Sequence, residues 1–177
     1  IVMANPLFAI RGGGDWRLLK GSPAVDVGDP AIVPAAGEFD ALGFGHPRVD
    51  DGDFDGASRL DLGAIEFGGL ITNAGLHGTL TVGQTLVLTQ WGQPGALRAL
   101  LLGLPGAPLD LGDKGFVYLA TSPLIVLSVG TLPPSGASVV LSGVLPPAAA
   151  GLTIHLQALQ KAGALHWTNL ERLTILP

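Results

Sequence analysis

The fold prediction rests on three adjacent stretches: GDWRLLKGSPAVDVGD (14–29), HPRVDDGDFDG (46–56) and ASRLDLGAIEF (57–67). In each of them, short apolar pieces are separated by glycine, proline, serine and aspartate, the residues that form turns. Residues 16–19 and 24–27 are strand-like pieces on either side of Gly21-Ser22-Pro23, and residues 62–67 are a third. The pattern predicts short strands joined by tight turns, with a loop-rich region between residues 28 and 60.

These stretches resemble the closing segment of bacterial extracellular proteins with right-handed parallel β-helix repeats, of the choice-of-anchor-like kind. The matching pieces occur in the family's order: Asn5-Pro6-Leu7-Phe8, Gly14-Asp15-Trp16-Arg17-Leu18, Gly21-Ser22-Pro23-Ala24-Val25-Asp26, Pro47-Arg48 and Asp61-Leu62-Gly63-Ala64-Ile65-Glu66. The resemblance implies an extracellular or cell-surface location and terminal β-helix coils, with an acidic loop-rich tail, over residues 1–70. Because repeats precede this segment in that family, and the sequence starts at Ile1, we expect a processed or partial chain.

The texture changes near residue 75, where strand-like segments begin to recur between glycine and proline turns. They are residues 79–90, 96–103, 115–120, 124–129, 137–145, 152–160 and 165–176. Polar and apolar residues alternate clearly from Thr79 to Gln90, which is the period of a half-buried strand. About seven short strands of this kind favour an antiparallel β-sandwich over residues 75–177, with Trp91 and Trp167 in its core or at its rim.

This second half also resembles a recurrent C-terminal module of secreted bacterial proteins, for which no activity follows. The matching pieces are Gly92-Gln93-Pro94-Gly95-Ala96, Leu109-Asp110-Leu111-Gly112, Leu132-Pro133-Pro134-Ser135-Gly136, Gly151-Leu152-Thr153-Ile154-His155-Leu156-Gln157-Ala158 and Thr168-Asn169-Leu170. The expected fold class is therefore all-β: a short right-handed parallel β-helix segment followed by an antiparallel β-sandwich.

Charge is distributed unevenly along the chain. Residues 1–72 hold eleven acids against five bases, whereas the remainder holds three acids against four bases. Neither half contains the basic cluster that nucleic-acid binding requires. The 47% apolar content argues against disorder, and with no cysteine the chain has no disulfide.

Residues 115–160 contain no Asp, Glu, Lys or Arg. Prolines and glycines interrupt this run before it reaches the roughly 18 apolar residues of a membrane-spanning helix, so we expect no transmembrane segment. A surface this poor in charge is unusual for a free monomer.

The strongest chemical motif is Asp51-Gly52-Asp53-Phe54-Asp55-Gly56. Alternating carboxylates followed by glycine open a calcium loop, because hard oxygen ligands converge while glycine permits the turn. The EF-hand spacing then fails, since position twelve of such a loop is Leu62. Asp51, Asp53, Asp55 and Asp61 are therefore candidate ligands for calcium, the only cofactor that the sequence suggests. The alternative is an acidic turn whose side chains cap backbone N–H groups.

Motifs for catalysis are weak. The chain has no cysteine and no Gly-x-Ser-x-Gly elbow, Ser22 lies in a turn, and the acids lie mainly in loops rather than on one rigid strand face. His46, His77, His155 and His166 are scattered, although His155 and His166 could face each other on neighbouring strands. Arg48 and Arg59 lie among acids and are interpreted as ion-pairing residues. We predict no catalytic residues and no enzyme activity.

The sequence thus favours a non-catalytic, extracellular structural or adhesive protein. Its expected partners are other copies of itself, joined into a filament or layer by strand addition, with residues 1–10 (IVMANPLFAI) as the candidate donor strand. Extracellular polysaccharide is a further candidate partner. Two alternatives stay open: a carbohydrate-adhesion module, and the non-catalytic C-terminal fragment of a β-helix enzyme that degrades polysaccharide.

Overall fold

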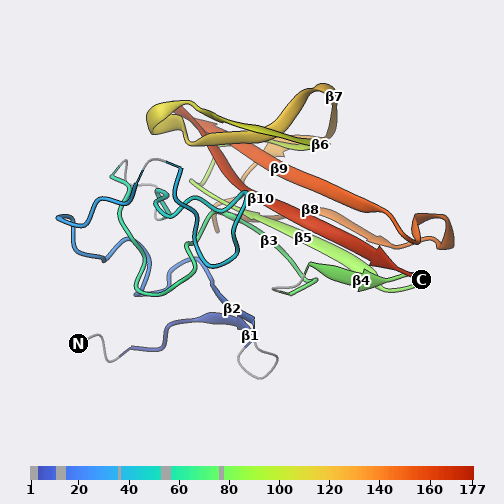
Figure 1. Cartoon of the computed structure of the whole chain (residues 1–177), viewed down its shortest axis with the longest axis horizontal. Coiled ribbons are helices and arrows are strands. Elements are labelled where there is room, and N and C mark those ends of the chain that lie inside the picture. The colour runs from blue at the N-terminus through green and yellow to red at the C-terminus, as the bar shows by residue number, and fades with distance from the viewer. Residues whose placement is uncertain (1–3, 11–14, 36, 53–56, 76–77) are drawn as a thin grey trace. The chain divides into compact units, whose positions relative to one another are not determined.

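The computed structural model describes residues 4–10, 15–35, 37–52, 57–75 and 78–177 (Figure 1). The chain divides into two compact units, Ile1–Gly69 and Leu70–Pro177. Regular structure in the described residues is strand, apart from two single-turn 3₁₀ helices, so the all-β prediction is confirmed. No helical segment in these ranges has the length and hydropathy needed to span a bilayer.

The first unit contains one antiparallel strand pair, β1 (Phe8–Ile10) with β2 (Asp15–Leu18). Its other described residues form turns and bends, together with two isolated antiparallel bridges, Phe39 with Pro47 and Asp50 with Arg59. No parallel ladder occurs in the described part of this unit. The parallel β-helix therefore stays an inference from the sequence resemblance.

Two predicted strands of the first unit are wrong, because residues 24–27 and 62–67 form turns, bends and irregular backbone. In the first segment, the hydroxyl of Ser22 accepts a backbone N–H within the turn, and Asp26 has a φ of 54°. In the second segment, the N–H of Glu66 donates to a carboxylate instead of a neighbouring strand. Side chains thus take the backbone groups that a ladder would have used.

The second unit consists of two sheets. Its strands are β3 (Leu70–Thr72), β4 (Thr79–Thr81), β5 (Thr85–Trp91), β6 (Leu97–Asp110), β7 (Phe116–Thr131), β8 (Ala137–Val144), β9 (Thr153–Ala162) and β10 (Ala164–Leu176). One sheet has the order β4-β10-β9-β6-β7 and the other β3-β5-β8. Neighbouring strands are antiparallel, except that β4 runs parallel to β10.

The core of this unit lies between the two sheets. Leu88 of β5 belongs to one buried cluster with Leu100 of β6 and Leu156 of β9. Leu86, two residues before Leu88, belongs to a second cluster with Leu173 of β10. The period-two alternation of the sequence therefore gives the buried face of β5, and the β-sandwich prediction is confirmed.

Three strand boundaries differ from the prediction. The segment 79–90 is divided into β4 and β5 by a turn at Gly83, whose φ is 85°. Residues 115–120 and 124–129 merge into β7, and β6 runs on to Asp110. Register shifts in the β6–β7 ladder let this long hairpin pass Pro105 and Pro123, where the sequence had indicated strand ends.

The start of β7 lies against the larger sheet at β9, where the side chain of Gln157 bonds to its backbone. Gln157 of β9 accepts the N–H of Tyr118 at 3.0 Å and donates to the carbonyls of Phe116 and Thr168, at 2.6 and 2.8 Å. β6 pairs with β9 only from Leu97 to Gly103, whereas its end pairs with the start of β7 at Leu109–Val117. The end of the β6–β7 hairpin therefore folds back toward β9. Figure 1 shows the β6–β7 hairpin at the top of this unit.

Candidate functional sites

Buried carboxylates hold the irregular first unit together. Asp40 accepts the N–H of Glu66, Glu66 accepts the N–H of Asp61, Asp61 accepts the N–H of Asp26, and Asp26 accepts the N–H of Arg59, at 2.8–3.0 Å. All four acids are buried. We call this series of bonds the carboxylate chain. Three of its bonds join segments far apart in the sequence, and the bond from Asp61 to Glu66 closes a turn. These carboxylates thus satisfy backbone N–H groups that strand pairing satisfies in the second unit.

Arg48 provides the positive charge beside this chain. Its guanidinium forms an ion pair with Glu66 and donates to the carbonyl of Gly63 at 3.0 Å. The interpretation of Arg48 as an ion-pairing residue is therefore confirmed. The side chain of Arg59 is exposed. Its backbone N–H belongs to the carboxylate chain, because it donates to Asp26.

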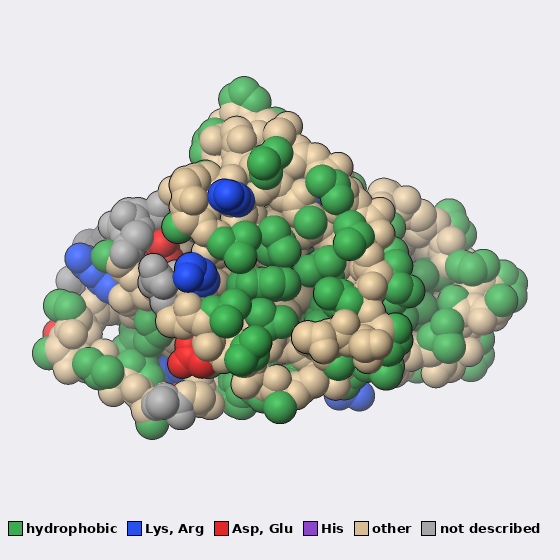
Figure 2. Space-filling model, turned by 90° about the horizontal axis from the view of Figure 1, so that it is seen from above, with side chains coloured by type: hydrophobic (Ala, Val, Ile, Leu, Met, Phe, Trp, Pro, Cys, Tyr) green, Lys and Arg blue, Asp and Glu red, His purple; other side chains and the backbone are tan. Residues whose placement is uncertain are grey.

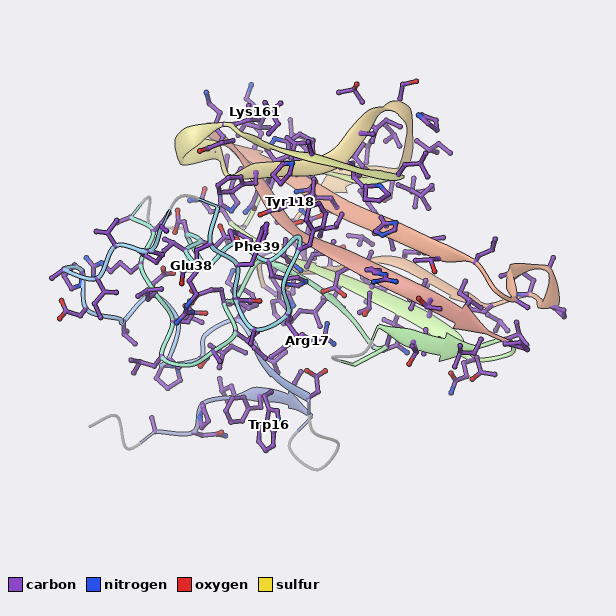
Figure 3. All side chains as sticks on the ribbon, viewed as in Figure 1. Trp16, Arg17, Glu38, Phe39, Tyr118 and Lys161 are labelled. Atoms are coloured by element: carbon purple, nitrogen blue, oxygen red, sulfur yellow. The ribbon has the colours of Figure 1, made fainter. Side chains whose placement is uncertain are left out.

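Arg48 also lines a shallow, open hollow of about 420 Å³. Its other lining residues are Glu38, Phe39, Asp40, Ala41, Gly63 and Ala64, and Figure 3 labels the first two of these. The two carboxylate oxygens of Asp40 accept the N–H groups of Leu42 and Glu66. These contacts indicate a structural use of the carboxylate.

Burial changes the acidity of the carboxylate chain. It raises the pKa of Asp40 to about 6 and that of Asp61 to about 6, in each case against the effect of accepted N–H bonds. Burial and the neighbouring charge of Asp61 raise the pKa of Glu66 to about 8. Arg48 acts in the opposite direction, but its side chain is 22% exposed whereas that of Glu66 is 2% exposed, so burial dominates.

The four predicted calcium ligands are not all described. Asp53 and Asp55 lie outside the described residues, Asp51 is half-buried, and Asp61 is buried with both carboxylate oxygens accepting backbone N–H groups, from Asp26 and Phe67. Among the described residues, no group of three or more acids and histidines is arranged to hold a metal ion. Calcium binding stays a prediction.

Gly52, inside the acidic motif, packs closely against the rest of the unit. A Cβ at this position would lie 2.8 Å from Val25 and 3.2 Å from the carboxylate of Asp26. Glycine is therefore needed here for close approach of the backbone.

The β1–β2 hairpin presents an aromatic side chain to solvent. Trp16 is 51% exposed and contacts Phe8 edge-to-face, with ring centroids 5.2 Å apart. The next residue, Arg17, is buried and forms a fork to Asp15, with N–O distances of 3.0 and 2.8 Å. This local fork fixes the strand that carries Trp16, which Figure 3 labels together with Arg17.

The histidines do not form the pair that the sequence suggested. On the β9–β10 ladder, His155 lies opposite Arg172, and His166 lies opposite Gln160. Burial and the charge of Arg172 lower the pKa of His155, which favours its neutral form. His46 lies in the first unit, and His77 is outside the described residues.

Sheet edges are the second candidate site. The edge strand β4 is three residues long, and the edge strand β3 is bonded by the side chain of Asn169. The remaining edges, β7 and β8, have sixteen and eight residues and lie entirely within the uncharged run 115–160. Natural proteins commonly protect such edges with charged residues, and these two strands have none.

The β7 edge is also apolar on its surface. Leu124, Ile125, Val126 and Leu127 are 41–56% exposed, and Val129 is 70% exposed. Figure 2, which looks onto the side of the β6–β7 hairpin, shows hydrophobic side chains gathered in one broad patch. A contiguous apolar surface of this kind is characteristic of an interaction site.

Comparison with protein-family models, curated proteins and solved structures found no significant match for this chain.

The sequence indicated parts of both sites and missed others. It identified Asp61, Arg48 and the uncharged run, but not Asp26, Asp40 or Glu66 as members of one buried network. Acids in irregular loops have no periodicity that would place them together. A usable signal was the number of acids around Arg48 and Arg59 in so apolar a chain, because acids buried there need backbone N–H donors.

Proposed function

We propose that this chain is a non-catalytic structural or adhesive module of an extracellular protein, and that copies of it assemble by strand addition. The observation that carries the proposal is the pair of long, uncharged edge strands β7 and β8 in the sandwich. Unpaired N–H and C=O groups at a sheet edge are satisfied by another strand, and exposed aliphatic side chains favour the same contact.

The structure changes which strand is the best candidate for this contact. Residues 1–10 were the predicted donor, but Phe8–Ile10 already pairs with Asp15–Leu18 in its own chain, and residues 1–3 lie outside the described residues. β7 and β8 each have a partner on one flank, and the sheet order gives them none on the other. The proposed contact is therefore at these edges.

The extracellular location is supported by the sequence resemblance alone. The non-catalytic role is supported by the use of the buried acids, whose carboxylates accept backbone N–H groups in the carboxylate chain.

Charged edge variants test the proposal. Sedimentation velocity over a hundredfold concentration range should show reversible growth in mass for the natural sequence, and electron microscopy should show filaments or layers. The double variant V126K/V139K, which charges both edges at side chains more than 50% exposed, should stay monomeric. The matched control V33K/L152K charges exposed aliphatic residues outside the strands and should assemble normally. A natural chain that is monomeric throughout, or a double variant that assembles equally well, would contradict the proposal.

A carbohydrate-adhesion role has one supporting observation, the exposed ring of Trp16. An aromatic face held on a fixed hairpin is a suitable platform for a sugar ring. Affinity electrophoresis in gels containing cell-wall polysaccharides tests it: W16A should lose any retardation, and F44A, which removes another exposed ring of the same unit, should keep it. Equal mobility of all three proteins with and without polysaccharide would exclude this role for the glycans tested.

A further inference from the structure

We infer that the contact between copies is β7 against β7, antiparallel and about a two-fold axis, so that the five-stranded sheets of two copies join into one. This inference rests on the proposed function and names the strand and the symmetry of the contact. Its partner is a second copy of this chain. The argument concerns residues 124–131, the part of β7 beyond Pro123.

Residues 124–131 are paired with a neighbouring strand on one side only. Its residues pair with β6 in an antiparallel ladder that runs from Leu124 opposite Gly103 to Thr131 opposite Leu97. β7 is the last strand in its sheet, so none of the described strands lies on its other flank. Among the four edge strands it is the longest.

Exposure distinguishes β7 from the other edges. In a strand that packs on a core, buried and exposed residues alternate, as they do in β5. In β7 the four consecutive residues Leu124 to Leu127 are all exposed, so the strand is exposed on both faces there. On β8 the inward residue Val140 is 7% exposed and belongs to the core. A strand added beside residues 124–131 therefore covers more apolar surface than one added beside β8.

Charge supports pairing of β7 with itself. In a two-fold contact each residue faces a residue of the same strand, so any charge near the axis meets a like charge. Phe116–Thr131 contains no charged residue. The nearest cation on the neighbouring strand, Arg98, is half-buried and donates to the hydroxyl of Ser128 at 3.1 Å. The strand is thus self-complementary in charge.

Distances between identical residues report this symmetry directly. In an antiparallel pair about a two-fold axis, the separation is smallest at the axis. It then grows by about 7 Å for each residue away from it, twice the rise of a strand. In a parallel pair in register the separation is constant along the strand. In a contact of β7 with β8, the separation between identical β7 residues of the two copies shows no such minimum.

The absence of cysteine makes this measurement clean. Single-cysteine variants of the full chain at Leu124, Ser128 and Thr131 carry one nitroxide label each, and double electron–electron resonance gives the distances in the assembled state. We expect the three distances to increase with the separation of each labelled position from one common axis, by about 7 Å for each residue. Equal distances at all three positions, or distances without a minimum, would overturn the inference.

Single edge variants separate this inference from the proposed function. V126K should lower the association constant by at least about tenfold, because a charge on an edge strand opposes its pairing with another strand and the burial of the aliphatic side chains around it. V139K, an equally exposed position on β8, should leave this two-fold pair intact and affect only growth beyond the pair, because a two-fold contact closes on itself. If V139K abolishes pairing of two copies and V126K does not, the inference is wrong and the proposed function stands. If the natural chain never associates, both are wrong.

Discussion

The side-chain amide of Asn169 pairs with both backbone polar groups of Leu70, a residue 99 positions away. Its Nδ2 donates to the Leu70 carbonyl at 3.0 Å, and its Oδ1 accepts the Leu70 N–H at 2.9 Å. The Asn169 side chain thus forms, at the edge of β3, the two backbone hydrogen bonds that a neighbouring strand would form. Asn169 can do this because β10 has an irregularity in its register between Trp167 and Leu170, where the hydroxyl of Thr168 bonds to the backbone of Ala158.

Asn169→Asp should destabilise the second unit by about 3 kcal/mol. The change removes the donor to the Leu70 carbonyl and places a new carboxylate beside Glu171, which now accepts from Asn169 at 3.1 Å. Chemical denaturation followed by tryptophan fluorescence measures the loss.

A matched control exists in the same unit. Asn73 forms the equivalent pair of bonds, to Thr85 and Val87, but it is exposed. Asn73→Asp should cost about 1 kcal/mol or less, because water replaces the lost bond. Equal losses for the two variants would show that the buried amide has no special role.

Stability of the first unit should fall as the pH rises from 5 to 8.5. Asp40, Asp61 and Glu66 have raised pKa values in the folded chain, of about 6, 6 and 8. The folded state therefore holds more protons than the unfolded state above pH 4. Their stabilising contribution is complete below the unfolded pKa values and is lost as each folded pKa is passed.

Hydrogen exchange of the full chain, read at amides of residues 60–67 and corrected for intrinsic rates, measures this dependence. Glu66→Gln should remove the decrease in stability between pH 6.5 and 8.5. Glu38→Gln, the same change at an exposed carboxylate, should leave it intact. His46→Asn is needed as well, because histidine ordinarily titrates in this range and the His46 carbonyl accepts the N–H of Asp40. Loss of the slope in that variant would assign it to the imidazole.

The boundary at residue 70 has a direct consequence for truncation. A chain of residues 70–177 should fold alone, whereas residues 75–177, the sandwich bounds expected from the sequence, should be at least about 3 kcal/mol less stable. The shorter chain lacks β3 and with it Leu70 and Thr72, each 1% exposed. Thermal melts and NMR spectra of the two chains decide this, and indistinguishable melts would remove β3 from the core.

Calcium should raise the melting temperature of the full chain relative to EDTA, and Asp53→Ala should abolish the difference. Asp61→Ala should behave differently, because Asp61 accepts two backbone N–H groups and its loss should lower the melting temperature with or without calcium. Asp110→Ala, in the second unit, is the control. Calorimetry that detects no calcium binding to the natural chain would exclude the site.

Local patterns in the sequence predicted the second unit well. The alternation around Leu86 and Leu88 depends only on which residues avoid water, and it gave the buried face of β5 correctly. Prolines misled the prediction at β6 and β7. A proline ends a strand only where its missing N–H is needed, and the bulged ladder of this hairpin accommodates Pro105 and Pro123.

The sequence by itself determined the all-β class, the sandwich and the uncharged run that supplies β7 and β8. Only the tertiary structure decided that Asp26, Asp40, Asp61 and Glu66 form one network. It also decided that Asn169 bonds to Leu70, and that Gln157 bonds to the start of β7. The physical reason is that side-chain preference for water or for a strand is a local property with a short period, which a sequence displays. A hydrogen bond from a buried side chain to a distant backbone group depends on which segments meet when the chain folds.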